Sequence, residues 1–134
     1  MNYWLMKTEP STYSWDDLVR DKKTIWDGVR NYQARNNLKV MKKGDRILIY
    51  HSMDDKAIIG TGKVTQESFP DPSDNDWVVV EVAPDIKLKK PITLALVKAD
   101  KLLADMVLVK NSRLSVQPVK AEEFDLIIAK SEGE

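Results

Sequence analysis

The clearest strand of this sequence is the run Arg46-Ile47-Leu48-Ile49-Tyr50-His51. Successive side chains of a β-strand point to opposite faces, so Ile47, Ile49 and His51 point one way and the other three point the opposite way. The two aspartates at residues 54–55 indicate a turn after this strand. We therefore expect the chain to reverse direction there and to pair with the strand that it has just formed.

A second strand is expected from Ala57 to Thr65, antiparallel to the first. In this strand Gly60 and Gly62 share a predicted face with Ile58 and Val64. Two glycines on one face indicate either a bend in a curved sheet or room for another group beside the backbone.

Other elements follow from apolar periodicity and from capping residues. Further strands are expected at Tyr3–Lys7, Trp77–Val82, Ile86–Leu88 and Leu114–Gln117, the last stopped by Pro118. Helices are expected at Trp15–Asp21, Tyr32–Lys39 and Glu122–Lys130, with shorter helical pieces at Thr93–Lys98 and Lys101–Met106. Ser14 with Asp17 resembles a capping box, and Asn31 can cap the second helix. This pattern predicts an α+β domain around a small curved sheet or barrel of five to six strands.

The composition excludes several kinds of chemistry. A chain of 134 residues suits a single domain, 1–134, with a frayed tail over 131–134. The absence of cysteine excludes a thiol nucleophile, a disulfide framework and a cysteine-ligated metal. His51 is the single histidine, so one chain cannot build a two-histidine metal site, and the adjacent Ser52 points to the opposite side of the strand. We expect no metal, no cofactor and no catalytic residue.

Charge is distributed unevenly along a chain whose formal net charge is zero. Residues 20–63 carry eleven basic and five acidic side chains, whereas residues 64–87 carry six acidic side chains and one lysine. A basic segment in a neutral protein suits local contact with a phosphate chain, although charge alone favours a solvated surface. No run approaches the ~18 apolar residues of a membrane span, and no signal sequence is recognisable. We expect a cytoplasmic protein without membrane contact and favour a monomer.

Aromatic, amide and arginine residues gather in the segment Trp26-Asp27-Gly28-Val29-Arg30-Asn31-Tyr32-Gln33-Ala34-Arg35-Asn36-Asn37. A flat π face can stack on a base, amide groups can read a base edge, and guanidinium groups bind phosphates. The same composition also fits a surface helix with Trp26 as a core residue. His51 similarly fits either the wall of a base pocket or a buried imidazole that one partner satisfies.

Six short motifs follow one another along nearly the whole chain. They are Tyr3-Trp4-Leu5-Met6-Lys7-Thr8-Glu9-Pro10, the segment 26–37, Gly44-Asp45 leading to Tyr50-His51-Ser52, Ile59-Gly60-Thr61-Gly62, Phe69-Pro70-Asp71-Pro72 and Leu114-Ser115-Val116-Gln117-Pro118. In this order they resemble the motifs of the EVE domain, a member of the PUA-like group that is related to YTH readers and to the thymocyte nuclear protein family.

The resemblance implies both a fold and a site. The fold is a PUA-like small curved β-barrel of five to six mostly antiparallel strands with flanking short helices. The site is a pocket suited to a modified nucleobase. The resemblance places in this pocket Lys7, Thr8, Trp26, Asn31, His51 and Ser52. Contacts to the rim or to phosphates are expected from Arg30, Arg35, Lys42 and Lys43.

We therefore expect a non-catalytic nucleic-acid-binding module that accepts a modified, for example methylated, base in an aromatic-lined pocket, with DNA and RNA both open as the polymer. One alternative is a small hydrolase acting on a modified nucleoside or base, with Lys7 as base, Thr8 as nucleophile and Glu9 as proton carrier. Adjacent strand positions alternate sides, which argues against the convergence of these three. Another alternative is an accessory protein that contacts a partner through its acidic segment Glu67–Asp85.

Overall fold

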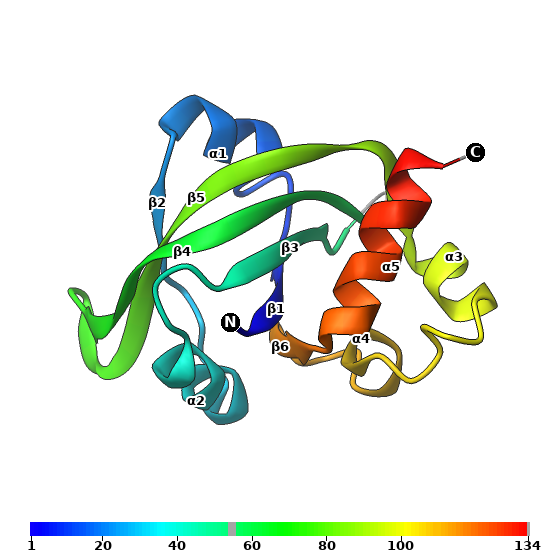
Figure 1. The fold of residues 1–134 in the computed structure, drawn as a ribbon. Coiled ribbons are helices and arrows are strands. Elements are labelled where there is room, and N and C mark those ends of the chain that lie inside the picture. The colour runs from blue at the N-terminus through cyan, green and yellow to red at the C-terminus, as the bar shows by residue number, and fades with distance from the viewer. Residues whose placement is uncertain (54–55, 134) are drawn as a thin grey trace.

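The computed structural model describes residues 1–53 and 56–133, so the turn expected at 54–55 and residue 134 lie outside the described residues. In chain order the described elements are β1 (Tyr3–Thr8), α1 (Trp15–Asp21), β2 (Thr24–Trp26), α2 (Tyr32–Val40), β3 (Arg46–His51), β4 (Ala57–Asp71), β5 (Asp74–Thr93), α3 (Leu94–Ala99), α4 (Val107–Lys110), β6 (Val116–Val119) and α5 (Ala121–Glu132). Figure 1 shows the long β4–β5 hairpin, with α2 below it and α3, α4 and α5 at one side.

The six described strands form one mixed sheet in the order β2-β5-β4-β3-β1-β6. β1 runs parallel to β3, with Leu5 opposite Leu48, and the other neighbouring pairs are antiparallel. The edge strands β2 and β6 do not pair with each other in the described part of the chain. The protein thus has the expected α+β, PUA-like arrangement, but the expected barrel is an open curved sheet.

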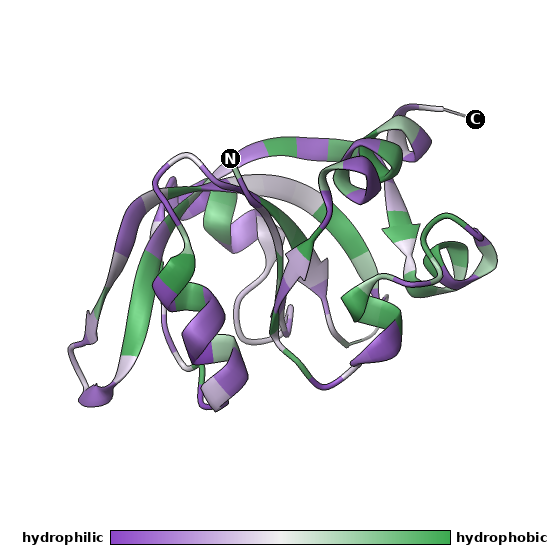
Figure 2. Ribbon diagram, turned by 60° about the horizontal axis from the view of Figure 1, so that its bottom comes forward, coloured by the Kyte–Doolittle hydropathy of each residue, from purple (hydrophilic) through white to green (hydrophobic). Residues whose placement is uncertain are grey.

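Each face of the sheet carries its own hydrophobic core. Ile47 and Ile49 of β3 belong to the first core, together with residues of α1 and α2. Leu48 and Tyr50 belong to the second core, together with residues of α3, α4 and α5. The alternation predicted for β3 is therefore confirmed. Figure 2 shows the hydrophilic end of the β4–β5 hairpin in purple and long hydrophobic stretches of the strands in green.

Local capping signals place the helices. The Ser14 side chain accepts a hydrogen bond from the backbone N–H of Asp17, whose carboxylate accepts from the backbone N–H of Ser14, so the predicted capping box is present. Asn31 caps α2 as expected. The tail expected to fray over 131–134 is helical as far as Glu132. Ser131 is buried there, and its hydroxyl donates to the carbonyl of Ile128.

Long-range pairing extends and joins the predicted strands. β5 unites the two strands expected at Trp77–Val82 and Ile86–Leu88, because β4 pairs with it along nearly its whole length. The helix expected over Lys101–Met106 is instead a series of turns that leads into α4. The sequence predicted that Pro118 would end this strand, but β6 continues through Pro118 to Val119. Proline is tolerated there because β6 is an edge strand of the sheet.

An irregularity in β4 corrects the expected common face of its residues. The pairing register with β5 shifts between Ile58 and Gly60, and Ile58 packs in the second core whereas Val64 packs in the first. A Cβ atom at Gly60 would lie 2.7 Å from ring atoms of the buried Trp15. The room beside this glycine is therefore filled by an indole of the same chain.

Candidate functional site

A cavity of about 480 Å³ opens between the end of β1 and the strand β2. Its lining residues are Lys7, Thr8, Glu9, Thr12, Tyr13, Thr24, Ile25, Trp26, Asp27 and Gly28. Three strands separate β1 from β2 in the sheet, which in a flat sheet would place them about 19 Å apart. Curvature of the sheet therefore creates the cavity, whose volume is in the range of pockets that hold small molecules.

Trp26 forms part of the cavity wall and part of the first core at the same time. Its side chain is 8% exposed and packs among the buried residues of that core. The Tyr13 ring meets it edge to face, with ring centroids 6.5 Å apart and an interplanar angle of 84°. The indole is therefore held rigidly while it still borders the cavity.

Thr8 connects the end of β1 to the loop that closes the cavity. Its hydroxyl donates a hydrogen bond of 2.6 Å to the carbonyl of Tyr13. A threonine hydroxyl has one hydrogen and two lone pairs, so this bond uses the donor and leaves acceptor capacity. Thr8 thus both positions Tyr13 and lines the cavity.

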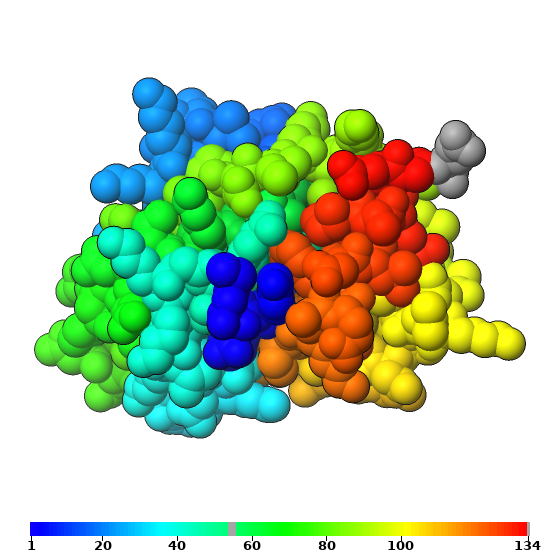
Figure 3. Space-filling view, in the orientation of Figure 1, coloured from blue at the N-terminus to red at the C-terminus, as the bar shows by residue number. Residues whose placement is uncertain are grey.

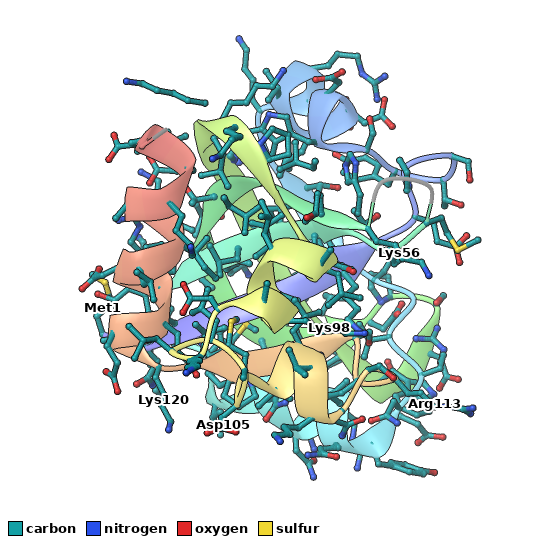
Figure 4. The ribbon with its side chains drawn as sticks, turned by 90° about the vertical axis from the view of Figure 1, so that its right-hand side faces the viewer. Met1, Lys56, Lys98, Asp105, Arg113 and Lys120 are labelled. Carbon is teal, nitrogen blue, oxygen red and sulfur yellow. The ribbon has the colours of Figure 1, made fainter. Side chains whose placement is uncertain are left out.

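Lys7 contributes to the lining, but its ammonium group lies on the other face of the sheet. The Nζ atom donates to the carbonyl of Ser112 and lies 5.8 Å from the ring centroid of Tyr50, a residue of the second core. Burial lowers the pKa of Lys7 from its ordinary value. The structure therefore separates the Lys7 ammonium from Thr8, as the strand alternation predicted. Arg113, labelled in Figure 4, follows Ser112 and is exposed.

Two acidic residues that the sequence did not single out for the pocket, Glu9 and Asp27, line the cavity. Both are exposed residues. Gly28 follows Asp27 with φ of +78°, a left-handed conformation that favours glycine and turns the chain away from β2. Asp27 and Gly28 lie within the aromatic and amide segment, and Glu9 lies within the first motif, so proximity to these motifs was the available signal.

Asn31, His51 and Ser52 are not among the described residues that line the cavity. The His51 imidazole is buried, and its Nε2 atom accepts the backbone N–H of Trp15 at 3.0 Å, which fits the buried and satisfied alternative. The Asn31 side-chain oxygen accepts the N–H of Ala34. Ser52 lies next to the site, because its backbone N–H donates to the carbonyl of Thr8 at 2.9 Å.

Arg30 and Arg35 hold the β4–β5 hairpin against the start of α2. Arg30 forms an ion pair with the buried Asp71 at 3.4 Å. Arg35 donates to the backbone carbonyl of Asp76 at 2.9 Å. Hydrogen bonds from the Ser73 hydroxyl and backbone N–H, and the charge of Arg30, lower the pKa of Asp71 from its usual value. Both arginines are thus engaged within the chain.

Lys42 and Lys43 lie far from the cavity along the sheet. They are exposed residues of the turn that precedes β3. β1 and β3 are parallel, with Tyr3 opposite Arg46, so this turn lies at the end of β1 that is remote from Thr8. The structure therefore does not bring these lysines together with the cavity-lining residues.

The described residues offer neither a metal-binding cluster nor a membrane-spanning helix. No group of three or more His, Cys, Asp or Glu side chains is arranged to hold a metal ion. None of the described helices has the length and apolar character needed to cross a bilayer.

Comparison with known proteins identifies the family of this fold. The EVE domain model matches residues 2–130, which is nearly the whole chain. The chain belongs to the EVE domain family. Among curated proteins, human thymocyte nuclear protein 1 is 37% identical over an alignment of 169 positions, which covers 99% of this chain and 75% of the human protein.

Solved structures of similar proteins agree with the fold. A Rhodopseudomonas palustris protein solved by NMR is 46% identical, with a TM-score of 0.94 and coverage of 98% of this chain and 93% of that chain. The human THYN1 protein, crystallised in complex with DNA containing 5-methylcytosine, is 33% identical, with a TM-score of 0.93 and coverage of 100% of this chain and 99% of that chain.

Proposed function

We propose that this EVE domain binds DNA that carries a modified base and accepts that base, turned out of its stack, in the cavity between β1 and β2. The observation that carries the proposal is a cavity of about 480 Å³ bordered by the Trp26 indole in a fold shared with the human protein crystallised with 5-methylcytosine DNA. Proteins that bind a single base hold it by stacking on an aromatic face and by hydrogen bonds to its edge.

The lining favours a base over a phosphate group. Glu9 and Asp27 place carboxylates beside the cavity, and the Lys7 ammonium is directed to the other face of the sheet. Like charge excludes phosphate from such a cavity, whereas a carboxylate accepts a hydrogen bond from an exocyclic amino group such as N4 of cytosine. We therefore propose that the cavity selects cytosine-type bases, and that the apolar surface of Trp26 and Ile25 accommodates a methyl group.

Thymine provides the sharpest comparison, because it carries the same methyl group but a carbonyl where cytosine has an amino group. We expect 5-methylcytosine to bind about fourfold better than cytosine, since one buried methyl contributes about 0.8 kcal/mol. Thymine should bind more weakly than either base, because a carbonyl facing a carboxylate leaves both acceptors without a donor.

Calorimetric titration with DNA oligonucleotides that differ only in this base tests the proposal. Trp26→Phe retains a flat ring and should keep the preference, whereas Trp26→Leu removes the π face and should weaken binding about tenfold. Asp27→Asn and Glu9→Gln introduce amide donors and should reduce the discrimination against thymine. Equal, negligible heats for all modified and unmodified bases would refute the proposal, and a ribose version of the same oligonucleotide compares RNA with DNA.

A further inference from the structure

Tyr32 at the start of α2 and Trp77 of β5 form an aromatic platform, a short distance along the chain from the cavity-lining residues. The two rings are stacked, with centroids 5.3 Å apart and planes inclined by 25°. The Arg35 guanidinium lies 4.8 Å from the centroid of Tyr32 and 5.6 Å from that of Trp77, and the Arg30 guanidinium lies 5.4 Å from Trp77. Two aromatic rings and two guanidinium groups thus form one continuous π and cation surface.

The platform is open to solvent. Tyr32 is 66% exposed although it is a large aromatic residue, and Trp77 is partly exposed. The Nε atom of Arg35 is buried and has no hydrogen-bond partner among the described residues. The guanidinium donates to the carbonyl of Asp76 through another nitrogen, but this buried Nε donor stays without a partner in the described part of the chain, which costs free energy.

The chain places the platform close to the cavity. Trp26 pairs with Val80 of β5, and Trp77 lies three residues before Val80 on that strand, a separation of about 10 Å. From the cavity residue Gly28 only three residues lead to Tyr32. In Figure 1, β2, the end of the β4–β5 hairpin and α2 all lie in the left half of the view.

The charge around the platform disfavours a phosphate as its ligand. Arg30 is paired with Asp71, and the adjoining hairpin turn also carries Asp74 and Asp76, both exposed. The charges of these three aspartates outnumber those of the two arginines, so the surface has no net positive charge that would attract a phosphate chain. A neutral planar group remains as the ligand that this surface fits, because every nucleobase has a π face.

We propose that the exposed ring of Tyr32, backed by Trp77, stacks on a base that neighbours the modified one in an unpaired stretch of the bound strand. This inference rests on the proposed function of the cavity and extends the interface by a second base. It also assigns Arg30 and Arg35 a role different from the phosphate contacts that the sequence indicated, because here they support the stacked rings.

Binding of single-stranded DNA with one central 5-methylcytosine tests this proposal by fluorescence anisotropy. One oligonucleotide has ordinary bases on both sides of the 5-methylcytosine, and its partner has abasic sites there. The natural protein should bind the abasic-flanked strand about tenfold more weakly, as expected for the loss of one stacked base. Tyr32→Ala should bind both strands equally, at this weakened level, and Tyr32→Phe should behave like the natural protein.

Two controls separate stacking from other effects. If Tyr32→Ala lowers the melting temperature, Tyr32→Leu, which still covers Trp77 but lacks a π face, replaces it. The salt dependence of binding should be the same for Tyr32→Ala and the natural protein, because stacking releases no counterions. The platform would be overturned if the natural protein bound the two strands with equal affinity. It would also be overturned if Tyr32→Ala still bound the abasic-flanked strand more weakly than the other.

Changing the central base of the strand tests the cavity independently of the platform. A protein that responds to abasic flanks but binds cytosine, 5-methylcytosine and an abasic central position equally would support the platform and refute the proposed function of the cavity. A protein with the opposite behaviour would retain the cavity and refute the platform. Absence of binding to every strand refutes both.

Discussion

The two ends of strand β1 each have a tryptophan beside a cavity, yet the polar groups around the two indoles are arranged differently. At the beginning of β1, Trp4 borders a cavity of about 520 Å³ near the start of α5. Figure 3 shows the first residues, in dark blue, between the cyan segment around α2 and the orange start of α5. At the far end of β1, Trp26 borders a cavity of about 480 Å³.

The difference lies in the polar groups around each indole. The Trp4 indole N–H donates to Asp45 at 3.0 Å, and the same carboxylate accepts the backbone N–H groups of Asn2 and Lys42 at 3.1 and 2.9 Å. At the far end, Glu9 and Asp27 face a cavity, and Thr8 retains acceptor capacity. Polar groups at the first end are buried and bonded within the fold, whereas Glu9 and Asp27 at the second end are exposed to solvent.

Removing the carboxylate of Asp45 should cause the largest loss of stability. Asp45 is 2% exposed, and three N–H donors converge on it. An amide in Asp45→Asn offers one acceptor oxygen and would direct an NH₂ group at the remaining donors. We expect a loss of about 2–4 kcal/mol in the free energy of unfolding, measured by urea denaturation.

Asp105→Asn is the matched control, because the Asp105 side chain is 82% exposed and its pair with Lys110 is a surface ion pair. Its effect should be under about 0.5 kcal/mol. Base binding should be unchanged in both variants at a temperature where they are folded. A stability loss for Asp45→Asn no larger than that of the control would remove the contrast between the two ends.

The same carboxylate should make stability depend on acidity. Burial opposes ionisation of Asp45, but hydrogen bonds from Lys42, Trp4 and Asn2 and the charged N-terminus outweigh it and lower its pKa. Its contribution is complete above the unfolded pKa of about 3.9 and is lost as the pH falls below that value through the folded pKa. Stability of the natural protein should fall more steeply in this window than that of Asp45→Asn in parallel urea titrations.

A larger residue at Gly60 of β4 should disturb the packing of the core at the second end of β1. In Gly60→Ala the new Cβ would lie 2.7 Å from ring atoms of Trp15, which is fully enclosed by the first core. Overpacking of this kind costs about 1–3 kcal/mol. Gly133→Ala is the control, because its Cβ would lie 3.4 Å from the nearest atom. Thermal unfolding that shows equal stability for both variants would contradict the close packing of Trp15 against the sheet.

Elements determined by neighbouring residues could be predicted from the sequence. The capping box of Ser14 and Asp17 and the cap at Asn31 each require only four consecutive residues, and both helices begin where expected. β2 was missed because Thr24–Trp26 has only three residues, too few to show a period. It forms by pairing with Val80–Val82, more than fifty residues away.

The candidate site was only partly visible for the same reason. Thr8 and Trp26 lie in motifs that resemble the family, and both line the cavity. Tyr13 and Thr24 line it because the sheet curves, which no local pattern encodes. The alternation of β3 correctly gave the face of His51, but it could not show that the N–H of Trp15 would lie opposite its ring nitrogen.

A smaller effect is expected from Thr8→Val, which keeps the shape of the side chain and removes its hydroxyl. The carbonyl of Tyr13 would lose its donor, which should cost about 1 kcal/mol of stability. Affinity for the modified base should also fall, because the loop that carries Tyr13 closes the cavity. Thr65→Val removes a hydroxyl bonded to Glu81 and should lower stability without changing affinity. Equal affinities of the two variants in calorimetric titration would argue against Thr8 as a cavity residue.

Lys7→Met should have the smallest effect, although Lys7 adjoins Thr8 in the strand. Burial of the ammonium lowers its pKa, so the desolvation cost offsets much of its hydrogen bond to Ser112. Methionine retains the apolar stem against Tyr50, and we expect a stability change within about 0.5 kcal/mol. The preference for 5-methylcytosine over thymine should remain, because the ammonium lies on the face opposite the cavity. A loss of that preference in Lys7→Met would mean that the lysine reaches the bound base. That result would contradict the placement of its ammonium group on the face of the sheet opposite the cavity.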